Sequence, residues 1–153
     1  MTPKAHLFIS LATAAALATA ASAQLVQEGG RPFTVQMNGH NEVNAAGTFD
    51  QGDPDGTGTA RLMLNEGQNR VCYDITVANI ATPTAAHIHR APVTAPGPIV
   101  VPLFTTSGTT MKGCTDNVSR DLIKDITQHP ANFYVNVHNA DFPAGAIRGQ
   151  LSK

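Results

Sequence analysis

The chain has 153 residues, with 10 Lys and Arg against 11 Asp and Glu, a formal net charge of −1 and no tryptophan. This length is typical of one domain with one hydrophobic core. A weakly acidic chain exerts no long-range attraction on the phosphates of nucleic acids or on anionic lipids, so both are excluded as favoured partners.

The N-terminal stretch MTPKAHLFISLATAAALATAASAQ has the pattern of a secretory signal peptide. Lys4 supplies the positive start, an alanine-rich apolar run follows, and Ala21-Ser22-Ala23 is a small-x-small cleavage signal. The sequence therefore predicts a signal peptide over residues 1–23, cut after Ala23, and one mature domain over 24–153. This domain would be secreted or periplasmic, and no later stretch is apolar for long enough to predict a membrane span.

The first half of the mature chain consists of short runs in which apolar and polar residues alternate, which is strand periodicity. Such runs cover residues 33–37, 59–64 and 70–78. The segment 44–56 is rich in Gly, Asn, Asp and Pro and predicts a long loop, whereas 66–69 predicts a tight hairpin turn.

In the second half, prolines bracket the histidine segment 85–90 and the apolar run 99–101, which favours edge strands and bulges over a central strand. A short helix is predicted to begin after Asn117 or Ser119 and to stop before Pro130, and two last strands follow at 133–138 and 146–151. About seven strands and one helix predict an all-β fold, an antiparallel Greek-key β-sandwich or barrel with one short helix.

The mature chain holds two cysteines, Cys72 and Cys114. Export implies an oxidising compartment, and an even number of cysteines then favours one disulfide. The alternative, in which two thiolates help to bind a metal, is weaker because neither cysteine has a second one nearby in the sequence.

Three histidines carry the functional hypothesis. His87 and His89 stand one residue apart, so in a strand both would project from the same face. His138 lies in the strand predicted at 133–138, on the face opposite its valines. If the two strands are neighbours, three imidazoles converge, a ligand set that suits copper or zinc. The alternative is that these histidines are hydrogen-bonded residues that only tie strands and loops together.

Further candidates have weaker support. His40 lies in a turn-like segment near a strand end, so it is either a fourth metal ligand or a solvated side chain. Glu42 and Arg148 stand on segments with few other charges and could form a structural pair. No catalytic residue is predicted, because no nucleophile motif stands out and the cysteines are expected to be bridged.

Several segments together resemble the CHRD domain, a module named after chordin that is also found alone in secreted microbial proteins. The segments are NGHNEV at 38–43, AAHIH at 85–89, GPIVVPL at 97–103, YVNVH at 134–138 and PAGAIRGQL at 143–151. They follow in order from residue 33 to residue 151. The resemblance implies an extracytoplasmic β-domain and does not imply catalysis.

The histidine pair is also similar to that of Cu,Zn superoxide dismutases, which sits on a Greek-key barrel. Three hypotheses follow. The first is a secreted module that binds a metal, with copper favoured and zinc as the alternative. The second is a metal-free extracellular interaction or structural module, for which an extracytoplasmic protein would be the partner, and the third is a copper-dependent redox enzyme of the superoxide dismutase kind.

Overall fold

The computed structural model describes residues 29–105 and 111–153, so the predicted signal peptide lies outside the described residues. Within the described part, all strands belong to one antiparallel sheet whose order is β5-β4-β7-β8-β1-β2-β3-β6. The strands are β1 (Arg31–Asn38), β2 (Thr57–Asn65), β3 (Arg70–Ala78), β4 (Ala85–Arg90), β5 (Ile99–Phe104), β6 (Lys112–Thr115), β7 (Phe133–His138) and β8 (Ile147–Gln150).

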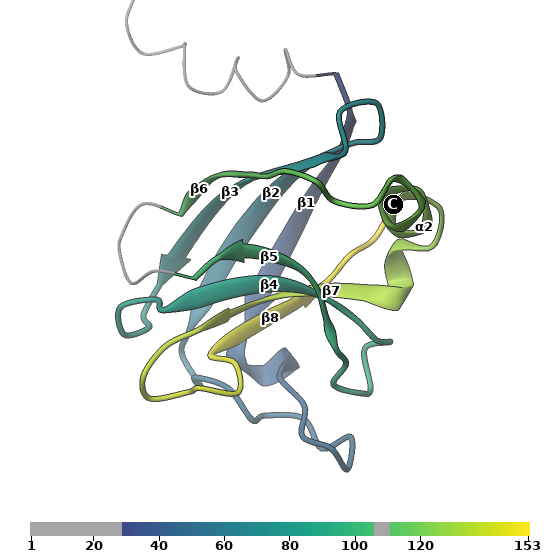
Figure 1. Cartoon of the computed structure of the whole chain (residues 1–153). Coiled ribbons are helices and arrows are strands. Elements are labelled where there is room, and N and C mark those ends of the chain that lie inside the picture. The colour runs from purple at the N-terminus through teal and green to yellow at the C-terminus, as the bar shows by residue number, and fades with distance from the viewer. Residues whose placement is uncertain (1–28, 106–110) are drawn as a thin grey trace, which may run out of the picture.

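The sheet curls until its two end strands, β5 and β6, approach each other, which gives a nearly closed barrel (Figure 1). Thr115 Oγ1 donates a hydrogen bond of 2.5 Å to the carbonyl of Pro102 across this gap. β5 pairs with β4 in an irregular register, as the prolines around it predict for an edge strand. The predicted antiparallel all-β barrel is confirmed.

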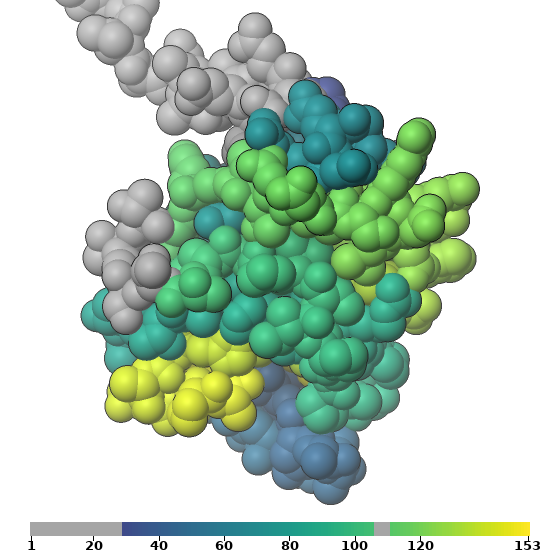
Figure 2. All heavy atoms as spheres, in the orientation of Figure 1, coloured from purple at the N-terminus to yellow at the C-terminus, as the bar shows by residue number. Residues whose placement is uncertain are grey.

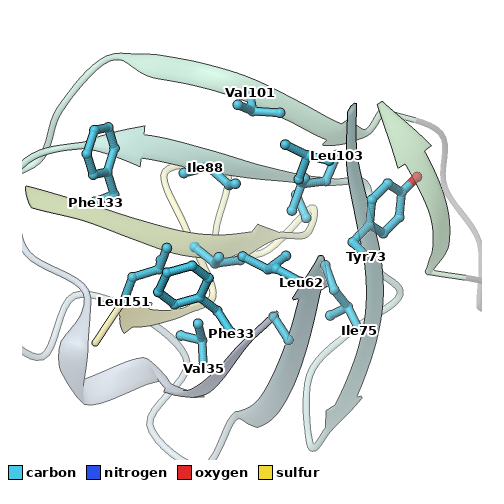
Figure 3. Close-up of a cluster of buried hydrophobic side chains, with 14 of the residues drawn as sticks. Phe33, Val35, Leu62, Tyr73, Ile75, Ile88, Val101, Leu103, Phe133 and Leu151 are labelled. Carbon is cyan, nitrogen blue, oxygen red and sulfur yellow. The ribbon is translucent and has the colours of Figure 1, made fainter. Parts of the chain in front are cut away.

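The strand periodicity of the sequence explains the core. Residues of one parity on each strand point into the barrel, where strands from opposite sides of the sheet bring their apolar side chains together (Figure 3). β4 and β7 contribute Ala86, Ile88, Phe133, Val135 and Val137 to this core. The residues between them point outward and form the site described below.

One helix, α2 (Arg120–Gln128), packs Ile123 and Ile126 against one end of the core. Its position confirms the predicted helix, because the chain turns at Pro130 into the short 3-10 helix η2 (Pro130–Asn132). Among the helices in the described part of the chain, none combines the length and apolar character that crossing a membrane requires.

β6 is the strand that the sequence analysis missed. Its four residues, KGCT, contain no alternating apolar pattern, so no periodicity marks them. Cys114 in β6 lies directly opposite Cys72 in β3, and the two form the predicted disulfide. The bridge joins an end strand to the rest of the sheet.

Three loops gather at one end of the barrel, as Figure 2 shows for the segments 39–56, 91–98 and 139–146. The first begins with a 3-10 helix, η1 (Gly39–Asn41), and the backbone N–H of Asp53 donates to the carbonyl of Ala146 in the third (2.8 Å). The loops cover the outer face of β7, so that all six residues of this strand are buried. A polar layer therefore lies between the barrel wall and the loops.

Ile88 tests whether the two faces of β4 act independently. Its side chain is fully buried in the core, whereas the histidines before and after it in the sequence point outward. Ile88→Val is expected to lower the free energy of unfolding by about 1 kcal/mol, the usual cost of one deleted buried methylene. Urea denaturation measures this cost. The variant should bind metal ions as the wild type does, and a tenfold change in affinity would contradict the assignment of the two faces.

Candidate metal centre

The structure brings His87, His89 and His138 together on the outer face of two neighbouring strands. β4 and β7 pair with Ala85 opposite His138 and with His87 opposite Asn136. One ring nitrogen from each histidine lies within 4.8 Å of those of the other two. Within residues 29–105 and 111–153, no other group of three or more His, Cys, Asp or Glu side chains converges in this way.

Backbone carbonyls orient two of the three rings. His89 Nδ1 donates to the carbonyl of Gly97 (2.8 Å), and His138 Nδ1 donates to the carbonyl of Pro143 (3.0 Å). Since a carbonyl can only accept, both Nδ1 atoms carry the proton and both Nε2 atoms are unprotonated, each with a lone pair that can accept or coordinate. A donated Nδ1–H of this kind is the usual way in which a protein orients a metal-binding imidazole.

The third ring, His87, is partly exposed and lies beside His138. Its Nδ1 is 3.0 Å from His138 Nε2. Because His138 is protonated on Nδ1, the His87 Nδ1–H must donate in this hydrogen bond. A tautomer change would move that proton to Nε2 of His87 and leave two lone pairs facing each other, an arrangement that a cation would stabilise.

Burial favours the neutral form of all three imidazoles. Burial is the main cause that lowers the pKa of His87 to about 4, with added repulsion from His138 and His89. Burial likewise lowers the pKa of His89 and of His138. Protons therefore do not compete with a metal for these nitrogens at neutral pH.

One atom of the cluster stands out. His89 is 7% exposed, and its Nε2 is buried without a hydrogen-bond partner. An unpaired buried nitrogen costs free energy, and a bound ion or an ordered water would satisfy it. Zinc and copper bind imidazole nitrogens at about 2.0–2.1 Å, which places the nitrogens roughly 3.4 Å apart. The nitrogens of the cluster lie within 4.8 Å of one another, so the rings must adjust to hold one ion.

Tyr134 and Asn136 share the outer face of β7 with His138. The ring of Tyr134 stacks on His89, with centroids 4.7 Å apart and planes 8° from parallel. The backbone N–H of Gly97 donates to Tyr134 Oη (3.3 Å), so one glycine fixes both rings. Asn136 is buried, its Oδ1 likewise has no hydrogen-bond partner, and its amide influences the pKa of both His89 and Glu42.

His40, the candidate fourth ligand, lies outside the cluster. It is exposed in η1, and its Nδ1 is 2.5 Å from a carboxylate oxygen of Asp50 in the same loop. The loop pairs it with an acid and so turns it away from the three histidines. The solvated alternative describes its position.

Glu42 and Arg148, the candidate structural pair, are both buried, at 5% and 1% exposed. In the described part of the chain no salt bridge joins them, since the Arg148 guanidinium donates instead to the carbonyls of Ala95 (3.1 Å) and Pro92 (2.9 Å). They interact as charges at longer range. Burial raises the pKa of Glu42 to about 7, against the opposing effects of Arg148 and Asn136.

Sequence reasoning anticipated the histidines because period-2 alternation assigns them to one face. It could not find the roles of Gly97 and Pro143, because a carbonyl oxygen belongs to every residue and carries no side-chain signal. The contact between Tyr134 and His89 depends on strand pairing, which only the fold determines.

One comparison with known proteins finds a match. The family model described as the CHRD domain matches residues 33–151, which is nearly the whole described chain. No curated protein and no solved structure matches the chain.

Proposed function

The chain belongs to the CHRD domain family, which suggests an extracellular module, and from this premise we propose that it binds one metal ion through His87, His89 and His138. Copper is the favoured ion and zinc the alternative. The disulfide fits an oxidising compartment, which supports a secreted or periplasmic location after removal of residues 1–23.

The observation that carries the proposal is the unpartnered Nε2 of His89. It belongs to a cluster of three imidazoles, two of which have their Nδ1 protons committed to backbone carbonyls; the Nε2 lone pair of His89 is free, and that of His138 accepts only from His87. A divalent or monovalent cation would satisfy this nitrogen and replace the hydrogen bond between His87 and His138.

The test is a competition titration of protein purified without a histidine tag, using Cu(I), Cu(II) and Zn(II). We expect one ion per chain with a dissociation constant below the micromolar range for at least one of the three. His89→Ala and His138→Ala should each weaken binding about 100-fold, because loss of one of three ligands removes a large share of the affinity.

His40→Ala is the matched control, since it removes an exposed imidazole that lies outside the cluster. It should leave the affinity unchanged. Equal losses in His40→Ala and His89→Ala, or a wild type that binds none of the ions in this range, would contradict the proposal.

A second candidate is a metal-free interaction module, favoured by the 3.0 Å hydrogen bond between His87 and His138. In that case the bond itself ties β4 to β7. A chelator would then leave the melting temperature of the wild type unchanged, whereas bound metal raises it by mass action.

A further inference from the structure

A column of three side chains extends from the histidine cluster into the polar layer. The Arg148 guanidinium carbon lies 3.5 Å from the centroid of the Tyr134 ring, and Tyr134 stacks on His89 at 4.7 Å. Because β7 lies between β4 and β8 in the sheet, the tyrosine ring is packed between the imidazole and the guanidinium. A fixed cation thus stands directly behind one ligand of the candidate metal centre.

The charge of Arg148 is not neutralised where it lies. Its hydrogen bonds go to uncharged acceptors: the carbonyls of Ala95 and Pro92, and Oε1 of Gln150 at 3.4 Å. These bonds satisfy the guanidinium donors but add no negative charge. Arginine stays protonated in proteins, so the positive charge persists and disfavours further positive charge on His89.

The three candidate ligands do not compensate for the positive charge of Arg148 either. Three neutral imidazoles bring no negative charge, and no carboxylate belongs to the cluster within the described residues. Glu42, an acid in the polar layer, is buried and interacts with Arg148 only as a charge at longer range, without a salt bridge among the described residues. While Glu42 is protonated, any ion bound at the cluster therefore meets a repulsion from Arg148 that grows with its own charge.

We propose that Arg148 makes the histidine cluster selective for monovalent copper over divalent ions. The inference rests on the proposed function and names the ion class of the same site. A divalent ion carries twice the charge of Cu(I) and suffers twice the repulsion from the guanidinium. At the separation that two stacked groups impose, one extra unit charge corresponds to about a tenfold change in affinity.

The test measures the ratio of the Zn(II) and Cu(I) dissociation constants at pH 6 under anaerobic conditions, with competing chelators, for wild type, R148K and R148M. R148M removes the charge at similar length, and we expect the preference for Cu(I) over Zn(II) to fall about tenfold. R148K keeps the charge but loses the planar guanidinium, so it should keep the preference. An unchanged ratio in R148M, or an equal fall in R148K, would overturn the inference.

A second arm uses intact Arg148, in case R148M does not fold. The charged and titratable groups that face Glu42 are Arg148 of β8 and Tyr134 of β7, with the Asn136 amide beside them. Once ionised, Glu42 partly neutralises Arg148. Raising the pH from 6 to 8 should therefore lower the Cu(I) preference of the wild type but not that of E42Q, and a constant wild-type ratio would overturn the inference.

The outcomes separate the inference from its premise. If the wild type binds none of the ions, the proposed function fails and the selectivity fails with it. If the ions bind through the three histidines but their ratio does not respond to R148M or to pH, only the role of Arg148 is wrong. The His40→Ala variant should show the wild-type ratio throughout.

Discussion

Replacing both bridged cysteines with alanine, as C72A/C114A, is expected to lower the free energy of unfolding by about 4 kcal/mol. The disulfide spans 42 residues of chain and restricts the unfolded state, and the chain-entropy relation gives this magnitude for such a loop. It also holds β6, a four-residue strand at the end of the sheet that pairs with β3 alone in the strand order. Equilibrium denaturation in urea measures the loss.

Alanine avoids placing a hydroxyl in the buried position of Cys72. The control is the wild type with its disulfide reduced, which should unfold at the same urea concentration as the variant. The histidine cluster lies on the outer face of β4 and β7 and includes no residue of β3 or β6, so the folded variant should keep its metal affinity. A loss below 1 kcal/mol would contradict the view that the bridge secures the end strand.

Glu42→Gln is expected to change how stability depends on pH. Burial raises the pKa of Glu42 from 4.5 to about 7, so between these values the folded protein holds a proton that the unfolded chain has lost. Stability from this group is full below pH 4.5 and is lost as the pH rises through 7, because the folded state binds more protons there. The shift corresponds to about 3 kcal/mol.

The measurement is the free energy of unfolding of wild type and E42Q at intervals from pH 4 to 8, with a chelator present. The lowered pKa values of the three histidines give an opposite slope in both proteins, so the difference between the two curves isolates Glu42. E42Q should gain stability over the wild type as the pH rises. Glu66→Gln, in the hairpin turn, should follow the wild type, and parallel curves for E42Q would show that Glu42 is not the titrating group.

Much of the fold could be predicted from local pattern. Alternation along residues 59–64, 70–78 and 133–138 assigns each side chain to the core or to the outside, because side chains on a strand point to opposite faces in turn. The helix was predictable from its apolar spacing and from Pro130. β6 was not, since KGCT has no such pattern and its pairing with β3 depends on contacts between residues distant in the chain, among them the Cys72–Cys114 bridge.

The sequence by itself determined an antiparallel β-domain, a disulfide and two same-face histidines, because each of these depends on residues close in the chain or on the count of cysteines. Only the tertiary structure decided that β7 lies between β4 and β8. That order places His138 beside His87 and packs Tyr134 between His89 and Arg148. The same fold pairs His40 with Asp50 and directs Arg148 to backbone carbonyls rather than to a salt bridge with Glu42. These contacts join residues that are not near neighbours in the sequence, so a local pattern cannot predict them.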